Sequence, residues 1–379
     1  MKKNKWVIAI GATVLICVVS LLAYRVQNQS VSDGVIRIGA ILPLTGAQSF
    51  YGHEVQNAML LAEDEINKTN KRKVKVVIED SHDNPGQGLA IAQRMSSNTN
   101  FIALINGGSA VALSLASPAA GFKLPLIGTL ASDEELSRQS EWSFRAYLSS
   151  RQQAEAMAEY AKKDLRLEKI SMLIVNNEHG ITSSRFFETK FTALGGQIVS
   201  KDMYDIAAVD LKTTVAKLIH DNPEGVYVFG YGVGYLSAIN QLCSINYKGE
   251  ILTMETMTLE SVRSAIKDTE RKFYFTGTNF DDEKNERANR FRKAYEGRFK
   301  ELPSHVGAFA YDTVHFISQG LEEGRRGRSG LQEWLRSANT VEGILGVEFF
   351  DESRNMVVPL SIFALDNGRI VSLKQIMGR

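Results

Sequence analysis

The side chains that commonly perform enzyme chemistry are present in this sequence, but their spacing fits no catalytic motif. There is no GxxxxGK[ST] phosphate-binding loop, no HExxH zinc motif, no CxxC pair and no GxSxG nucleophile elbow. The six histidines are scattered, and no two of them have the spacing of paired metal ligands. We therefore expect neither an enzyme of a common class nor a metal or organic cofactor.

Polar residues with a clearer positional signal follow the short apolar segments that we expect to be strands. Rich in Gly, Ser, Thr and aromatic residues, these loops span residues 45–51, 106–109, 130–133, 176–180, 230–234 and 255–258. Ligands of an open parallel sheet bind beyond the carboxyl ends of its strands, so these loops form a candidate binding surface. Gly230, Gly232 and Gly234 have GxGxG spacing rather than the GxGxxG of dinucleotide sites, which indicates a tight turn.

The elements that would position these loops alternate along the chain. Val55, Met59, Ala62 and Ile66 recur at helical spacing, for example, between two apolar segments. The expected strands are residues 35–42, 74–78, 101–105, 124–127, 170–175, 197–203, 225–229, 251–254 and 273–276. This alternation predicts α/β architecture with parallel sheets covered on both faces, and the strands are too many for one compact sheet, so we expect two domains.

The end of the chain and its charge add two constraints. Residues 347–371 have the character of a β-hairpin, with Asp366-Asn367-Gly368 as the turn signal. Lys and Arg total 44 against 43 Asp and Glu, a balance that argues against nucleic-acid binding. We expect the basic residues of 325–328 to form a solvated turn.

The first 30 residues indicate export. Residues 2–5 are KKNK, and residues 6–24 form an uncharged apolar run long enough to span a bilayer as a helix. A retained membrane anchor with a cytoplasmic N-terminus, a cleaved signal peptide and a lipoprotein signal at Cys17 remain alternatives. Each of them places the remainder outside the cytoplasm, in the periplasm or on the outer face of the membrane, with Cys243 as its only thiol.

Six segments match, in order, the succession found in one known family. They are VIRIGAILPLTGAQSFYGHEVQNAMLLAEDEIN (35–67), VVIEDSHDNPGQGLAIAQRM (76–95), INGGSAVALSLASPAA (105–120), LPLIGTLASDEEL (124–136), SFRAYLSSRQQAEAMAEYA (143–161) and FAYDTVHF (309–316). Together they resemble the branched-chain amino-acid (Leu/Ile/Val-type) periplasmic solute-binding proteins of ABC transporters. The resemblance covers essentially everything after Val35.

The resemblance implies a type I periplasmic binding protein fold. Two Rossmann-like lobes would be joined by three crossover strands, with a ligand cleft between lobes that close by a hinge. The crossings are expected near Tyr147, Thr278 and Met356. Lobe 1 would combine 35–147 with 279–355, lobe 2 would combine 148–278 with 356–379, and 1–30 would be the anchor or signal segment.

The resemblance also implies which residues hold the ligand in lobe 1. Amino-acid binders of the family hold the α-carboxylate with a Ser hydroxyl and with N–H groups at a helix start, and by order that residue matches Ser109. Ser132 matches a Thr that contacts both the carboxylate and the ammonium, although the family's following Pro is absent. Leu130 and Ala131 would offer backbone carbonyl and amide groups, and Tyr51 matches an aromatic residue that lines the cleft.

In lobe 2 the resemblance places a carboxylate opposite the ligand ammonium, at Glu255. This residue directly follows an apolar strand, and a buried carboxylate needs a partner such as a ligand cation. At two positions where amino-acid binders of the family have a tyrosine, this chain differs. His179 stands at the first of these positions, and Tyr231 lies one residue away from the second. These departures put an aliphatic ligand in doubt, and Glu178 or His179 could contact a polar ligand side chain.

The resulting functional prediction is an extracytoplasmic receptor for a small polar metabolite, an amino acid above all, which it delivers to the membrane subunits of an ABC permease. The alternative is a membrane-anchored sensor in which lobe closure is passed to a signalling partner.

Overall fold

The computed structural model describes residues 35–46, 48–266, 271–282, 284–323, 327–337 and 339–376. The expected anchor at residues 6–24 lies outside these ranges. Within them, none of the helices has both the length and the apolar composition that crossing a membrane requires.

The strands are short and mostly buried, as the apolar segments predict. They are β1 (Ile36–Leu42), β2 (Val74–Asp80), β3 (Phe101–Asn106), β4 (Leu126–Gly128), β5 (Ser143–Arg145), β6 (Lys169–Val175), β7 (Gln197–Tyr204), β8 (Gly225–Phe229), β9 (Glu250–Leu252), β10 (Phe273–Thr278), β11 (Val341–Glu342), β12 (Val347–Phe350), β13 (Met356–Val357), β14 (Leu360–Asp366) and β15 (Arg369–Ile376). Strand β5 has no counterpart among the expected strands, and β9 ends two residues earlier than expected.

The helices follow the strands in alternation. They are α2 (Ser49–Thr69), α3 (Pro85–Ser97), α4 (Ser109–Phe122), α5 (Glu135–Arg138), α6 (Ser150–Lys163), α7 (Glu178–Ala193), α8 (Lys212–Leu218), α9 (Gly232–Ser244), α10 (Glu260–Arg263), α11 (Glu286–Phe299), α12 (His305–Glu322) and α13 (Gly327–Arg336), with 3-10 turns η1 (Glu255–Thr258) and η2 (Asn279–Asp281).

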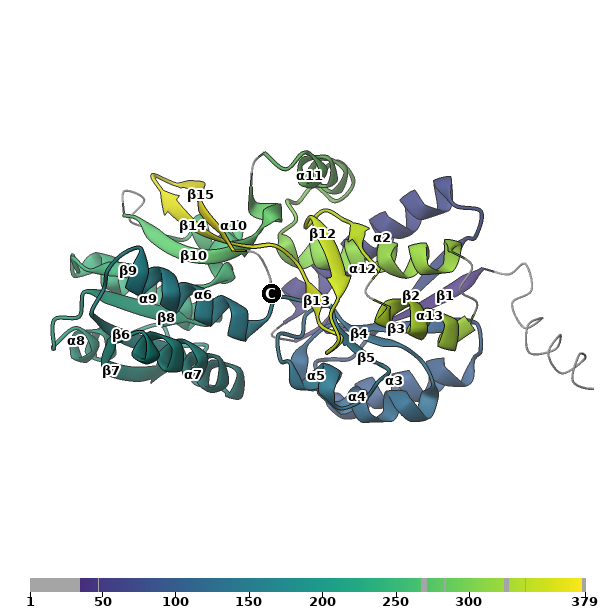
Figure 1. Cartoon of the computed structure of the whole chain (residues 1–379), viewed down its shortest axis with the longest axis horizontal. Coiled ribbons are helices and arrows are strands. Elements are labelled where there is room, and N and C mark those ends of the chain that lie inside the picture. Colours follow the sequence, from purple (N-terminus) through teal and green to yellow (C-terminus); the bar gives the residue numbers. More distant parts are fainter. Residues whose placement is uncertain are drawn as a thin grey trace, which may run out of the picture.

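Two large sheets organise the molecule into two lobes, which lie side by side in Figure 1. Lobe 1 contains a five-stranded sheet with the order β2-β1-β3-β4-β5, in which all neighbours are parallel. Lobe 2 contains a seven-stranded sheet with the order β15-β14-β10-β9-β8-β6-β7. The α/β class and the type I fold that the sequence predicts are present.

The sheet of lobe 2 is parallel except at one edge, where a hairpin from the end of the chain joins it. Strands β14 and β15 form an antiparallel hairpin, and β14 pairs antiparallel with β10. The hairpin turn falls at the predicted place, where Asn367 and Gly368 both have positive φ, as a two-residue type I′ turn requires. A chain that reaches the edge of a sheet through a tight turn must return antiparallel, so this short connection decides the strand direction.

Helices from both ends of the sequence cover the sheet of lobe 1. Helices α11, α12 and α13 come from the last third of the chain, yet α11 and α12 pack on α2 and α13 packs on β3 (Figure 1). Sheet membership changes after β5, after β10 and after β13, near the three expected crossings. The residue boundaries of the lobes stay a prediction.

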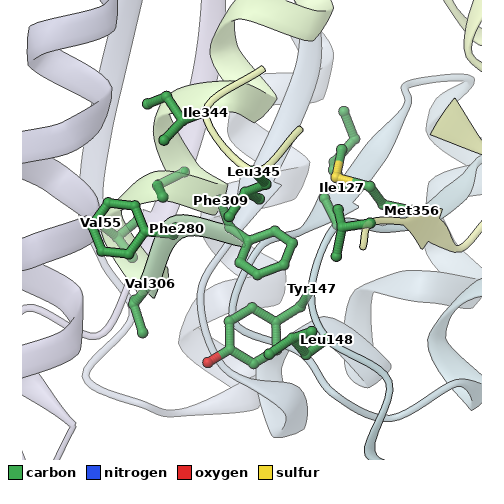
Figure 2. Packing of buried hydrophobic residues seen from close by; sticks show 14 of the residues in the cluster. Val55, Ile127, Tyr147, Leu148, Phe280, Val306, Phe309, Ile344, Leu345 and Met356 are labelled. Atoms are coloured by element: carbon green, nitrogen blue, oxygen red, sulfur yellow. The ribbon is translucent and has the colours of Figure 1, made fainter. Parts of the chain in front are cut away.

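The crossings pack together at the centre of the molecule. Tyr147 and Leu148 of the first crossing and Met356 of the third belong to one buried cluster with Phe309 of α12 (Figure 2). The rings of Tyr147 and Phe309 have centroids 5.1 Å apart. These contacts pack the first crossing against the third in one buried cluster.

A buried arginine joins the same two crossings. Arg145 is 1% exposed, and its Nε donates to Asn355 Oδ1 at 2.8 Å while its Nη1 donates to the carbonyl of Tyr147 at 2.7 Å. Burial lowers the pKa of the Arg145 guanidinium to about 10, so it remains charged at neutral pH. Its hydrogen bonds offset part of the cost of burying that charge.

The basic segment at 325–328 is not simply a solvated turn. The guanidinium of Arg328 donates to four backbone carbonyls, those of Ser96, Asn98, Phe101 and Phe122, at 2.8 to 3.1 Å. These carbonyls lie at the C-terminal ends of α3 and α4 and at the start of β3, where helix carbonyls have no intrahelical partner. Arg328 therefore anchors α13 to lobe 1. Residues 325 and 326 lie outside the described ranges.

Candidate functional site

A cavity of about 580 Å³ lies between the two lobes. The side chains that line it include seven of the eight residues that the sequence singles out: Tyr51, Ser109, Leu130, Ser132, His179, Tyr231 and Glu255. The eighth, Ala131, is 1% exposed and packs in the hydrophobic core of lobe 1, so any contribution from its backbone stays a prediction.

Apart from Tyr51, which lies in α2, these residues lie just beyond the carboxyl ends of parallel strands, as the sheet rule predicts. Ser109 is the first residue of α4 after β3, and Leu130 and Ser132 follow β4. On the other lobe, residue 179 is the second of α7 after β6, Tyr231 precedes α9 after β8, and Glu255 opens η1 after β9. The two edges of strand ends therefore face each other across one cavity.

The start of α4 is shaped for close approach to a ligand. Gly108 precedes the helix with a φ of 98°, a left-handed conformation that glycine adopts without strain. The first turn of a helix carries N–H groups without intrahelical partners and a partial positive charge, so this end favours an anion. The hydroxyl of Ser109 adds a further donor at the cavity wall.

Glu255 is the most unusual charged residue of the cavity. It is 6% exposed, and its Oε2 is buried without a hydrogen-bond partner among the described residues. Burial raises the pKa of the Glu255 carboxyl to about 7, its own backbone N–H and the nearby Gln153 side chain oppose the rise, and the charge of Asp281 adds to it. A carboxyl in this environment gains strongly from a cation placed beside it.

Phenols from lobe 1 and the first crossing lie near this carboxyl. Burial, and then the charge of Glu255, raise the pKa of Tyr51, which reaches the carboxyl from lobe 1. The same two causes raise the pKa of Tyr147 on the first crossing. Both phenols therefore stay protonated, and they present hydrogen-bond donors and ring faces around the cavity.

His179 contacts the opposite lobe directly. Its Nδ1 lies 3.2 Å from Ser132 Oγ and 3.5 Å from Ser183 Oγ. Burial lowers the pKa of His179 to about 4, so the ring is neutral at neutral pH and one of its nitrogens is an acceptor. Nothing is described of the side chain of Glu178, the other polar residue that the sequence suggested here.

Sequence reasoning missed several cavity residues. His305 opens α12 and bridges the lobes: its Nε2 lies 3.1 Å from Tyr147 Oη and its Nδ1 lies 3.0 Å from Thr258 Oγ1. Ser150 and Arg151 open α6 and also line the cavity, as do Arg138 and Asn177. The position of His305 just after Ser304, a strong helix N-cap, is a sequence signal for that residue, and Asn177 lies in the candidate loop 176–180.

Comparison with known proteins gives the family. The family model described as "Periplasmic binding protein" matches residues 35–369. The chain belongs to the periplasmic binding protein family. Among curated members, Leu/Ile/Val-binding protein homolog 3 of Brucella melitensis is 27% identical over 352 residues, which are 89% of this chain and 94% of that protein.

Solved structures of the family share the two-lobed fold. The leucine-binding protein LivK of Thermotoga maritima superposes with a TM-score of 0.80 at 22% identity, covering 90% of this chain and 99% of that one. The LivJ protein of Streptococcus pneumoniae, solved with isoleucine, has a TM-score of 0.81 at 20% identity and covers 91% and 100%. A solute-binding protein of Rhodopseudomonas palustris, solved with 3,4-dihydroxybenzoic acid, has a TM-score of 0.79 at 19% identity and covers 91% and 98%.

Proposed function

We propose that this protein captures an amino acid outside the cytoplasm, between two lobes that close on it, and delivers it to the membrane subunits of an ABC permease. Family membership supports the receptor role and the location. The names of the relatives support amino acids as a class, while the benzoate-type ligand of one neighbour shows that the fold also accepts aromatic acids.

The observation that carries the amino-acid proposal is the buried carboxyl of Glu255, whose Oε2 has no hydrogen-bond partner among the described residues. A ligand ammonium at this point would lose its water and would need an anion in compensation. On the facing lobe, the start of α4 with Ser109 supplies donors for the ligand carboxylate. An aromatic monocarboxylate has no cation and would leave Glu255 unpaired.

The test is a comparison of Glu255→Gln with wild type in a calorimetric panel of amino acids and benzoates. We expect wild type to bind at least one amino acid, and the variant to bind it about ten- to 150-fold more weakly, the range for a hydrogen bond to a charged group. Glu260→Gln removes an exposed carboxylate from the next helix and serves as the matched control. Unchanged affinity in Glu255→Gln, or binding of benzoates alone, would overturn the amino-acid assignment.

A further inference from the structure

The first turn of α6 forms a second polar wall of the cavity, to which the proposed function assigns no role. Ser150 is 5% exposed and lines the cavity, and its Oγ is buried without a hydrogen-bond partner among the described residues. Nε of Arg151, the next residue, is likewise buried and without such a partner. Unmade hydrogen bonds in a buried site are costly, so groups of this kind indicate a ligand.

The backbone at this point adds donors of the same kind. Helix α6 is 14 residues long, and its N-cap Ser149 accepts from the N–H of Gln152 through its side chain and from the N–H of Gln153 through its carbonyl. The N–H groups of Ser150 and Arg151 belong to the same first turn, where N–H groups lack intrahelical partners. Hydroxyl, guanidinium and amide donors therefore lie together at the first turn of α6. This part of the cavity wall suits a ligand group that accepts hydrogen bonds and does not suit a hydrocarbon group.

The guanidinium of Arg151 is held in place on the cavity wall. Its central carbon lies 4.4 Å from the ring centroid of Phe186, which also lines the cavity. From the facing lobe, Glu134 Oε2 lies 3.5 Å from Arg151 Nε and 3.6 Å from an Arg138 nitrogen, both beyond good hydrogen-bond length. Glu134 Oε1 accepts from Ser149 at 2.5 Å. One carboxylate thus faces two guanidinium groups, whose donors remain available.

Helix geometry relates this wall to Glu255. Ser150 and Gln153 are three residues apart, so they lie on the same face of α6 with Cβ atoms about 5–6 Å apart. The Gln153 side chain lies near the Glu255 carboxyl and influences its pKa, its Nε2 is buried without a hydrogen-bond partner among the described residues, and its Oε1 accepts from Thr276 at 2.7 Å. The donor cluster is therefore about one helical turn from the ammonium position, roughly the length of a side chain of two or three carbon atoms.

Resting on the proposed function, the geometry points to an α-amino acid whose side chain ends in a carboxylate or a carboxamide, with that end bound by Ser150, Arg151 and the first turn of α6. Both ends offer the acceptor oxygen that these donors require. A leucine side chain would bury the donors without partners. A site built to hydrogen-bond its ligand rejects an analogue that lacks the acceptor far more strongly than an apolar pocket rejects a polar one.

The test measures binding of L-glutamate, L-glutamine, L-leucine and L-alanine to purified wild type, Ser150→Ala and Arg151→Met. We expect wild type to prefer glutamate or glutamine to leucine by at least 100-fold. Ser150→Ala should weaken the preferred ligand about three- to tenfold, and Arg151→Met about ten- to 150-fold if that ligand is glutamate and less if it is glutamine. Binding of alanine, which has no side-chain acceptor, should stay within twofold. Arg185→Met, an exposed charge on α7, is the control.

Three outcomes would overturn the inference, and they differ from one another. Tight binding of leucine with none of glutamate or glutamine would reject the side-chain class and leave the amino-acid receptor intact. Equal weakening of alanine and glutamate in Arg151→Met would mean that α6 holds the α-carboxylate instead. Failure of every amino acid would reject the proposed function together with this inference.

Discussion

At the scale of single residues, the buried carboxyl of Glu255 is the group in the cavity that most favours a cation beside it. Its pKa of about 7 lies above the ordinary value because burial disfavours the charged form. A group whose folded-state pKa is raised stabilises the fold below its unfolded pKa, and that contribution is lost as the pH rises through the folded value. For Glu255 the loss falls between about pH 4.5 and pH 7 and is complete near pH 8.

Glu255→Gln should therefore stabilise the protein without ligand at alkaline pH, although it impairs binding. Gln keeps the shape and removes the charge that burial penalises, so we expect a gain of up to about 3 kcal/mol at pH 8 and little change at pH 5. Thermal unfolding of wild type and Glu255→Gln between pH 5 and pH 8, without ligand, measures this gain in stability. An equal melting temperature at pH 8 would show that the carboxylate is well solvated.

Affinity for an α-amino ligand should rise with pH between 5.5 and 8. Only the ionised carboxylate attracts an ammonium, so below the Glu255 pKa of about 7 binding must first release a proton. Titration calorimetry near pH 6.5, in buffers of different ionisation enthalpy, should detect that release. Glu255→Gln should abolish both the proton release and the pH dependence, and a flat pH profile in wild type would contradict the argument.

The sequence predicts such cavity residues well where they follow strands, and poorly elsewhere. The loops that carry Ser109, His179 and Glu255 were identifiable because the carboxyl ends of parallel strands share one edge, and the family resemblance singled out these residues within the loops. Ala131 packs into the core while Leu130 and Ser132 face the cavity, since neighbouring residues of an extended segment point to opposite sides. The start of α6 could not be predicted, because its place depends on how the crossings set one lobe against the other.

At the scale of elements, hydrogen bonds from long polar side chains hold helices in positions that the sequence alone does not predict. Arg328 satisfies carbonyls at the ends of α3 and α4, and Glu54 of α2 accepts hydrogen bonds from Ser304 and Gly307 at the start of α12. Burial raises the pKa of Glu54, and those hydrogen bonds oppose the rise. Sequence patterns predict that these helices form, whereas contacts between distant segments decide where each one packs.

Arg328→Met should lower the free energy of unfolding of lobe 1 by about 2–4 kcal/mol. The change leaves carbonyls of Ser96, Phe101 and Phe122 without their donor, and each lost bond to a charged group costs about 1.5–3 kcal/mol, partly offset by water. Denaturant unfolding compared with Arg290→Met, which removes an exposed arginine, measures the difference. Matching midpoints for the two variants would mean that water replaces the guanidinium at little cost.

At the scale of the whole molecule, the cavity lies between lobes that meet through a few polar contacts and a packed hinge. Ser132 contacts His179 across the cavity, and His305 contacts Thr258. The first and third crossings are held together by Arg145 and Asn355 (the packed cluster beside them is shown in Figure 2). This arrangement favours rotation of rigid lobes about the crossings rather than deformation within either lobe.

Saturating ligand should reduce the radius of gyration measured by small-angle X-ray scattering, because closure of the lobes buries the cavity. His305→Ala should reduce the ligand-induced change, since it removes a contact between lobe 2 and the first crossing. His220→Ala, distant from the cavity lining, should behave as wild type. An identical scattering curve with and without ligand in wild type would argue against hinge closure.

The hydrogen bonds between Glu54 and Ser304 also have a consequence for folding during synthesis. The two residues are 250 positions apart, and helices α11 to α13, which cover α2 and β3, are synthesised late, just before strands β11 to β15. Contacts of such long sequence separation slow folding, because a large loop must close before they form. The N-terminal half therefore waits, with its apolar faces uncovered, until synthesis is nearly complete. Such a delay would suit export of the chain before it folds, and we expect a product truncated before α12 to be sensitive to proteases.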